Sequence, residues 1–366
     1  MRYLSADIIY PLHREPIRQG VLVLNTDGHI IDLLESRDGI DKLEVYKGFL
    51  CPGFVNTHCH LELSHLLGKL PEKKGLPDFI SRLPKYRKAR PSVIQESITW
   101  ADAQMHSNGI VAVGDISNTS DTFNLKSKSP IHYHTFIELF TTDESKVDSV
   151  FSNGLELKKK CKTSASLVPH ASYSVAQKLL HKIRDNNVGE LISIHNQETP
   201  SENELFEKGS GKLQQQIQAL GPLHISGKSA LKTTLPKLPK APTLLVHNTY
   251  TSIEDVKWAE SQKDNLYWCT CPNANLYIEG VLPNYNIFQY SKMTIGTDSL
   301  ASNYSLSVWD EVKTIQKHTE LDINTLLIWA CKNGAEFLQL DNLGTFEKGK
   351  KPGVCWVNEA GVKRLA

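Results

Sequence analysis

Two histidines separated by a single residue offer the first chemistry in this sequence. The stretch from Phe54 to Glu62 reads Phe-Val-Asn-Thr-His-Cys-His-Leu-Glu, an apolar run typical of a strand, and it places His58 and His60 two positions apart. Alternate side chains of a strand point to the same face, so both imidazoles can approach one point in space. Two neutral imidazoles at one point suit a divalent metal such as zinc, iron or nickel.

Further polar residues stand at the ends of other apolar runs, and they are His170, His195, His247 and Asp298. A single histidine after a strand is most often structural, but this many strands ending in histidine or aspartate are hard to explain by chance. The carboxyl ends of all strands in a barrel meet at one mouth, where catalytic groups gather. We therefore expect one divalent metal to be bound by three imidazoles and one carboxylate, those of His58, His60, His195 and Asp298.

This ligand set is typical of a catalytic site, because a closed structural zinc site favours thiolates. Zinc is the expected ion, and iron and manganese are alternatives because the ligands suit several metals. Such a metal lowers the pKa of a bound water towards about 7. Asp298 can accept the proton of that water, and His247 can orient the water or stabilise developing negative charge.

Glu198 follows His195 by three residues, in the stretch His-Asn-Gln-Glu. Just past a strand end, its carboxyl group can lean over a substrate without binding the metal. It could donate a proton to a ring nitrogen while hydroxide attacks the adjacent carbon, and later pass that proton to a leaving amine. The structural alternative is an acidic residue in the first turn of a helix, together with Glu202 and Glu204.

The elements that would position these residues alternate between apolar runs and helical stretches. Eight runs read as strands: 54–60, 110–116, 131–140, 166–170, 191–195, 243–247, 265–271 and 293–297. Helical patterns fill most of the gaps, for example at 94–106, 175–185, 253–261 and 307–318. This alternation predicts an α/β fold, namely a (β/α)8 TIM-like barrel, although runs this short could also form an open sheet.

Both ends of the chain have a different character, with short apolar runs at 6–10, 20–24, 29–34 and 353–357. The dipeptide Asp27-Gly28 indicates a hairpin between two of these runs. Neither end could bury a core alone, so we expect the ends to pair. The predicted domains are a small β-sandwich of residues 1–50 and 341–366, and a metal-dependent hydrolase barrel of residues 51–340.

Composition narrows the classes of partner. The 366 residues carry a formal net charge of +1, so electrostatics alone give no reason to expect a nucleic acid or an anionic membrane as partner. The chain has no run of about 18 apolar residues and no signal-peptide pattern at its N-terminus. Seven scattered cysteines argue against a disulfide framework and predict a reducing, cytoplasmic location. The expected partner is a small-molecule substrate.

One connection, from Thr199 to Pro242, is long for the link between a strand and a helix. It contains a predicted polar helix at 210–220 and a lysine- and proline-rich stretch at 228–240. Long loops after barrel strands often build or cover an active site. The favoured interpretation of the basic stretch is a solvated face.

In combination, these motifs resemble the amidohydrolase superfamily, in its mononuclear-metal deaminase and chlorohydrolase branch. The matching stretches begin at Pro52, Pro169, Ile194, Val246, Cys271, Gly296 and Gly344. The resemblance covers nearly the whole chain. It implies a distorted (β/α)8 barrel with a terminal β-sandwich, the metal ligands named above, catalytic roles for Glu198, His247 and Asp298, and a homodimer.

Two departures from the family refine the expectation. Binuclear members carry a carboxylated lysine at the end of the fourth strand, whereas this chain has Ser166-Leu-Val-Pro-His170 there, so one metal is expected. The stretch from His60 to Ser64, His-Leu-Glu-Leu-Ser, is similar to the aminodeoxyfutalosine deaminase-like subgroup. By resemblance His170 reaches the substrate. Glu138 could bind a sugar hydroxyl or form a rim ion pair, and Phe79 could cover a base or simply fill a helix core.

The predicted function is that of a metal-dependent aminohydrolase that deaminates an adenine-type nucleoside or a related heterocycle and releases ammonia. One alternative is an amidohydrolase or chlorohydrolase that acts on a C–N amide or C–Cl bond of another heterocycle. An alternative of another class is a barrel that binds a metal or ligand without catalysis. An α/β-hydrolase triad is disfavoured because the chain has no Gly-X-Ser-X-Gly motif.

Overall fold

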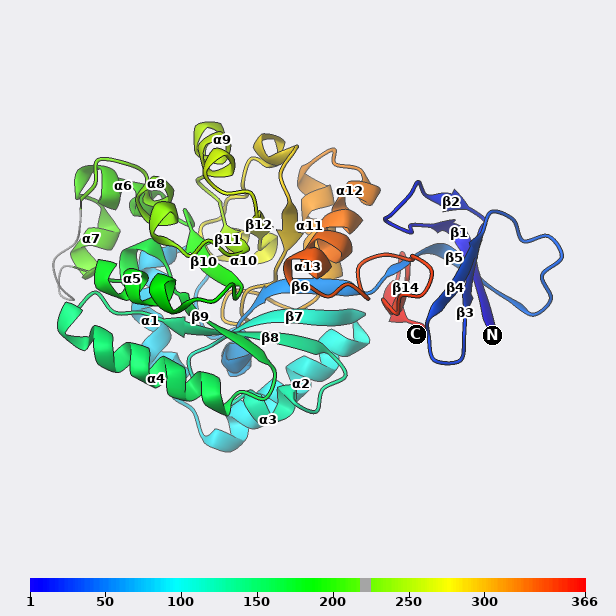
Figure 1. Cartoon of the computed structure of the whole chain (residues 1–366), viewed down its shortest axis with the longest axis horizontal. Coiled ribbons are helices and arrows are strands. Elements are labelled where there is room, and N and C mark those ends of the chain that lie inside the picture. The colour runs from blue at the N-terminus through cyan, green and yellow to red at the C-terminus, as the bar shows by residue number, and fades with distance from the viewer. Residues whose placement is uncertain (218–224) are drawn as a thin grey trace.

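The computed structural model describes residues 1–217 and 225–366, and its larger part contains two parallel sheets (Figure 1). The first sheet has the order β6 (Phe54–Cys59), β7 (Ile110–Ser117), β8 (His132–Leu139) and β9 (Ser164–Pro169). The second has the order β10 (Ile192–Asn196), β11 (Thr243–His247), β12 (Leu266–Thr270) and β13 (Met293–Ile295). All eight predicted runs are therefore strands.

The two sheets meet at both of their edges. A parallel bridge joins Cys59 to Asp298, and another joins Ala171 to His195. At the second edge, the amide of His195 donates a hydrogen bond to the carbonyl oxygen of His170 at 2.9 Å. The carboxyl ends of strands from both sheets consequently lie side by side, as the sequence pattern predicts for the site residues.

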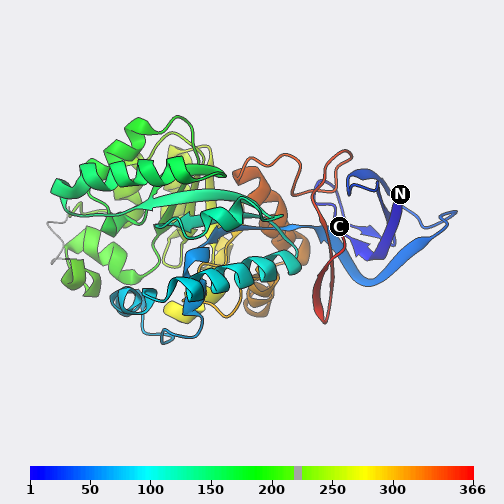
Figure 2. The same cartoon turned by 90° about the horizontal axis from the view of Figure 1, so that it is seen from below.

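Helices cover the outside of these sheets (Figures 1 and 2). Those that precede β10 are α1 (Leu76–Arg87), α2 (Pro91–Ser107), α3 (Phe123–Lys126), α4 (Val147–Lys160) and α5 (Gln177–Asn186). Those after β11 are α9 (Ile253–Gln262), α10 (Pro272–Ile278), α11 (Val308–His318), α12 (Ile323–Leu327) and α13 (Asn333–Phe337). Ser252 and Ser307 begin α9 and α11, because their side chains accept from Asp255 N and Asp310 N. The four helical patterns of the sequence coincide with α2, α5, α9 and α11.

Strands from both ends of the chain form one further sheet (Figure 2). It contains β1 (Arg2–Ile9), β2 (Ile17–Arg18), β3 (Val21–Leu24), β4 (Ile30–Leu34), β5 (Leu43–Pro52), β14 (Val354–Asn358) and β15 (Gly361–Arg364). β14 pairs antiparallel with β5, so the predicted pairing of the two ends is confirmed. β3 and β4 form the predicted hairpin. Leu4, Leu22, Leu50 and Phe346 lie in its core.

Gly53 is the single residue between β5 of the terminal sheet and β6 of the parallel sheet. A Cβ atom at this position would lie 2.3 Å from Cγ1 of Val111 and 2.8 Å from the carbonyl oxygen of Pro352. Only glycine lets the chain pass this point so closely. The strand that carries the two histidines is thereby fixed directly to the terminal sheet.

The connection from Thr199 to Pro242 folds into α6 (Pro200–Lys208), α7 (Lys212–Ile217), α8 (Ala230–Thr234) and the short 3-10 helix η5 (Leu235–Lys237). Residues 218–220 of the helix predicted at 210–220 lie outside the described residues. In the basic stretch Lys228 and Lys240 are exposed, as a solvated face requires, whereas Lys232 is half-buried, with its Nζ atom 3.2 Å from the buried carboxylate of Asp255. In the described residues, no helix is long and apolar enough to cross a membrane.

Candidate active site

His58 and His60 face a common point at the carboxyl end of β6. Their Nε2 atoms lie 3.2 Å apart, and both rings are buried. His58 belongs to the strand, and His60 begins the turn into the 3-10 helix η1 (Leu61–Leu66). Asp115 holds this turn, since its carboxylate accepts a hydrogen bond from the amide of Leu61 at 2.7 Å. The predicted convergence of the two imidazoles is therefore present.

His195 of β10 joins the pair from the second sheet. One ligand atom from each of His58, His60 and His195 lies within 4.8 Å of the other two. Nδ1 of His195 is 2.8 Å from the carbonyl oxygen of His170, so this nitrogen carries the hydrogen. The lone pair is left on Nε2, which is the arrangement that an outer hydrogen bond gives to metal-binding histidines.

Asp298 supplies the carboxylate beside these rings. Its Oδ1 atom lies 3.4 Å from Nε2 of His60 and 3.7 Å from Nε2 of His58. Its Oδ2 atom accepts a hydrogen bond from the hydroxyl of Ser302 at 2.5 Å. The backbone of Asp298 has φ 55°, a left-handed conformation that is costly for a residue other than glycine. Strain of this kind is typical of functional sites.

Burial sets the protonation states of this group. It lowers the pKa of His58, His60 and His195, so their imidazoles are neutral at neutral pH. Burial alone would raise the pKa of Asp298, but the surrounding histidines hold it below its usual range. Three neutral imidazoles and one ionised carboxylate form a donor set that fits a divalent metal.

Glu198 and His247 lie beside the predicted ligands. Oε1 of Glu198 is 3.8 Å from Nε2 of His247, and both side chains are buried. Nδ1 of His247 lies 2.9 Å from Oδ1 of Asn275, and this contact orients the ring. Burial, reinforced by the charge of Asp298, raises the pKa of Glu198 well above its usual range. Glu198 therefore keeps its proton to a higher pH than an ordinary glutamate does, as a proton donor requires.

The predicted substrate residues His170 and Glu138 lie on the other side of His195. The ring centres of His170 and His195 are 4.8 Å apart, and Nδ1 of His170 lies 2.6 Å from the hydroxyl of Ser174. Oε2 of Glu138 accepts a hydrogen bond from the side-chain Nδ2 of Asn118 at 2.9 Å. Its Oε1 is buried without a hydrogen-bond partner, 3.7 Å from Nδ1 of His195. A buried acceptor without a partner is available to a substrate.

Phe79, predicted as a lid or as helix core, lies on α1 and is half-buried. It packs against two apolar clusters. One contains Tyr173 and Phe206, and the other contains Leu63 and Ala301. Leu63 follows His60 by three residues and Ala301 follows Asp298 by three, so the second cluster adjoins the site. Contact between Phe79 and a substrate stays a prediction.

The sequence interpretation gave no role to Glu62, although Glu62 lies two residues after His60. The carboxylate of Glu62 accepts from the amides of Asn118 and Thr119 at 3.1 and 3.0 Å and pairs with Arg87. Asn118 in turn holds Glu138. An acidic residue in an otherwise apolar stretch was the only sequence feature that pointed to Glu62. Its partners lie at the end of α1 and just after β7 and could be found only from the fold.

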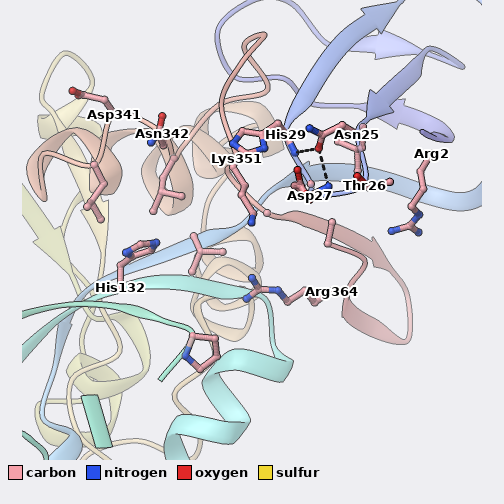
Figure 3. Close-up of a pocket in the computed structure, with 18 of the residues that line it drawn as sticks. Arg2, Asn25, Thr26, Asp27, His29, His132, Asp341, Asn342, Lys351 and Arg364 are labelled. Atoms are coloured by element: carbon pink, nitrogen blue, oxygen red, sulfur yellow. Dashed lines mark hydrogen bonds between the residues drawn. The ribbon is translucent and has the colours of Figure 1, made fainter. Parts of the chain in front are cut away.

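A separate cavity of about 960 Å³ lies at the amino ends of β7 and β8, next to the terminal sheet. Figure 3 shows Asp27, Asp341, Lys351 and Arg364 among the residues that line it. None of the predicted site residues lines it. The candidate active site is instead the cluster at the carboxyl ends of the strands.

Comparison with known proteins agrees with this geometry. A model of the amidohydrolase family matches residues 49–357. Adenosine deaminase of Helicobacter pylori is 27% identical over 323 residues, which are 82% of this chain and 77% of that protein. Aminodeoxyfutalosine deaminase of Nitratiruptor sp. is 26% identical over 318 residues, 82% of this chain and 76% of that protein.

Solved structures show the same fold. Aminofutalosine deaminase of Helicobacter pylori, in complex with methylthio-coformycin, has a TM-score of 0.81 at 23% identity, over 97% of this chain and 91% of that chain. Atrazine chlorohydrolase of Arthrobacter aurescens, complexed with zinc, has a TM-score of 0.74 at 15% identity, over 97% and 86%. These likenesses show that the fold is α/β and similar to a TIM barrel.

Proposed function

Because this chain belongs to the amidohydrolase family, we propose that it is a metal-dependent aminohydrolase that deaminates an adenine-type nucleoside and releases ammonia. The observation that carries the proposal is the position of a buried carboxyl group of raised pKa, that of Glu198, beside a cluster of histidines and one carboxylate. Replacing an exocyclic amine by oxygen needs an activated water and a proton donor, and this cluster offers groups for both.

The proposed metal ligands are His58, His60, His195 and Asp298, and zinc is the proposed ion, with iron or manganese as alternatives. When bound, the metal makes a water molecule nucleophilic at neutral pH. The donor set supports this assignment because a catalytic zinc site uses imidazoles and carboxylates and avoids a closed shell of thiolates. The metal content of the purified protein, measured by mass spectrometry, tests the assignment.

The chain's own residues divide the proton transfers. We propose that Asp298 accepts the proton of the attacking water and that His247, held by Asn275, orients this water. Glu198 donates its proton to the ring nitrogen next to the attacked carbon, so that the carbon can accept the new C–O bond. The amine then takes up the proton that Asp298 accepted from water and leaves as ammonia, while the hydroxyl proton returns to Glu198 and the ring carbonyl forms.

The substrate proposal leans to aminodeoxyfutalosine, because one relative at 26% identity bears that name and the stretch after His60 is similar to that subgroup. His170 and Glu138 are proposed to contact the substrate. The unpartnered Oε1 of Glu138 supports its binding of a hydroxyl group. Phe79 is proposed to cover the base, which its position between two apolar clusters supports.

The finer architecture also stands as a proposal. The bridges at both sheet edges support a closed (β/α)8 barrel of residues 51–340, and the terminal strands support a small β-sandwich of residues 1–50 and 341–366. The cysteines are free, which supports a reducing, cytoplasmic location. A homodimer is proposed from the family. A crystal structure tests the architecture, and analytical ultracentrifugation tests the dimer.

The deciding experiment is ammonia release by the metal-loaded protein from aminodeoxyfutalosine, adenosine, S-adenosylhomocysteine, methylthioadenosine, guanine and cytosine. Release from one adenine nucleoside, abolished in Glu198→Gln, is the expected result. Silence across the panel with one metal per chain would contradict the proposal. That result would favour hydrolysis of an amide or C–Cl bond. The similarity in fold to a chlorohydrolase is the reason for this alternative.

A further inference from the structure

The turn that carries Glu198 is built around one buried amide side chain. Gln197 lies directly before Glu198 and two residues after His195, and none of its surface is exposed. Its backbone has φ 45°, in the left-handed region that side chains disfavour. A residue keeps such a conformation only when the surrounding structure holds it there.

The side chain of Gln197 provides that hold. Its Nε2 atom donates to Oδ2 of Asp255 at 2.9 Å and to Oδ1 of Asn203 at 3.1 Å. Its Oε1 atom accepts from the hydroxyl of Thr251 at 2.7 Å. The backbone carbonyl of Gln197 also accepts from the amide of Tyr250 at 2.9 Å. Both amide hydrogens and the amide oxygen are therefore used, and the side chain points away from the metal ligands into the fold.

The partners of Gln197 belong to the long connection and to the helices packed against it. Asp255 on α9 also accepts from Ser229, at 2.9 Å, and lies 3.2 Å from Nζ of Lys232 on α8. Asn203 on α6 accepts from the amide of Ala230 at 3.1 Å. The connection from Thr199 to Pro242 thus provides two anchors for one turn.

A second contact from the same connection reaches the turn directly. Glu202 on α6 is buried, and its Oε2 atom accepts a hydrogen bond from the amide of Glu198 at 3.2 Å. The backbone amide of Glu198 is consequently held by α6. The carboxyl group of Glu198 remains directed at His247, 3.8 Å away.

We propose that Gln197 is a positioning residue for the reaction: its amide fixes the left-handed turn that directs Glu198 at the reacting atoms, with the connection after β10 as its anchor. The kinetic part of this proposal rests on the proposed role of Glu198 as proton donor. The hold on the turn does not. Displacing a catalytic group by about 1 Å can cost about 100-fold in rate, so loss of the hold has a measurable consequence.

The kinetic test is a double-mutant cycle in the metal-loaded protein. We expect Gln197→Ala to lower kcat about 10- to 100-fold while KM and metal content stay near those of the native protein. In the Glu198→Gln background the same substitution should lower the residual rate no further, because the positioned group is already absent. An equal fractional loss in both backgrounds, or loss of metal in Gln197→Ala, would overturn the proposal.

A rescue variant separates this hydrogen bond from general damage. Gln197→Glu alone places a carboxylate against Asp255 and should lower kcat. Gln197→Glu combined with Asp255→Asn reverses donor and acceptor and should recover part of the rate. The matched control is Tyr133→Phe on β8, which removes a buried 2.6 Å hydrogen bond to Asp102 on α2. It should lower the melting temperature and leave kcat unchanged. A rescue variant no faster than Gln197→Glu alone would count against the proposal.

Hydrogen exchange tests the hold without any substrate. In Gln197→Ala, the amides of peptides spanning 196–202 and 248–252 should exchange faster than in the native protein, and in Tyr133→Phe they should not. Unchanged exchange would overturn the hold whatever the enzyme acts on. Faster exchange in Gln197→Ala, with no deamination of any substrate in the panel by the native protein, would instead contradict the proposed function. It would still support the conclusion that the Gln197 side chain fixes the turn.

Discussion

The amide of Asp298 donates a hydrogen bond to the carbonyl oxygen of His58 at 3.1 Å. The amide of Thr297 donates to the same oxygen at 3.0 Å. This shared acceptor joins the last parallel strand to the first, so two proposed metal ligands that are 240 residues apart in sequence occupy one rigid unit. The left-handed backbone of Asp298 turns its carboxylate from this joint towards the imidazoles. The ligand geometry thus follows from the way the two sheets meet.

Glu198→Gln should abolish most turnover and keep the metal. The glutamine has nearly the same shape but no acidic proton to donate, and Glu198 is not among the proposed ligands. We expect kcat to fall at least about 100-fold, in the range that a general acid typically contributes, with unchanged metal content. Steady-state kinetics and metal analysis of the same preparation measure both. A near-normal rate would remove Glu198 from the mechanism.

His195→Ala should lose both metal and activity. The substitution removes one of three converging imidazoles. It also removes the hydrogen bond from Nδ1 of His195 to the carbonyl oxygen of His170, which orients the ring for metal binding. Metal content after dialysis is the measurement. His134→Ala is a suitable control, since this half-buried histidine forms a hydrogen bond with Ser166 on the neighbouring strand and is not among the proposed ligands. If His195→Ala retained the ion as tightly as the control, the ligand set would need revision.

The eight parallel strands could be predicted because each is a short apolar run between helical patterns. β5 could not be predicted in the same way. Its burial alternates irregularly along residues such as Glu44, Tyr46 and Lys47, and its parallel partner β1 lies about 40 residues earlier. Parallel neighbours leave no turn signal in the sequence.

The residues of the candidate site could likewise be predicted from the sequence only in part. Histidines at strand ends are visible in the sequence because residue type and position coincide there. The groups that orient them are less visible: Asn275 beside His247, and Ser302 beside Asp298, are ordinary polar residues until the fold brings them within hydrogen-bond distance. Sequence patterns predict which groups can react, and tertiary contacts decide how these groups are aimed.

The pH dependence of kcat/KM should show an alkaline limb from Glu198. Burial, together with the charge of Asp298, raises its pKa well above that of an ordinary glutamate, which is about 4.3. A proton donor works only while protonated, so kcat/KM should hold at pH values above the pKa of an ordinary glutamate and fall only as the pH rises through the raised pKa. A rate that already falls between about pH 4 and 5 would indicate an ordinary, solvated carboxylate and contradict the assignment.

Lys126→Met should destabilise the whole chain, because it breaks a fully buried ion pair. Lys126 on α3 pairs with Asp115 on β7, and neither side chain is exposed. Removing the cation leaves an uncompensated buried carboxylate, which typically costs about 3–5 kcal/mol. Urea unfolding measures the loss. The contrasting control is Lys182→Met, whose pair with Asp148 is exposed and should contribute no more than about 1 kcal/mol.

A second variant shows whether this cost comes from the stranded charge. Asp115 also accepts the hydrogen bond from Leu61, next to His60, so its carboxylate connects the ion pair to the metal ligands. Adding Asp115→Asn to Lys126→Met removes the unpaired charge and keeps an acceptor for Leu61. It should recover part of the unfolding free energy and retain metal binding. If Lys126→Met unfolded at the same urea concentration as Lys182→Met, the carboxylate would have to be protonated or hydrated in the fold, and the ion pair would not be what stabilises this strand.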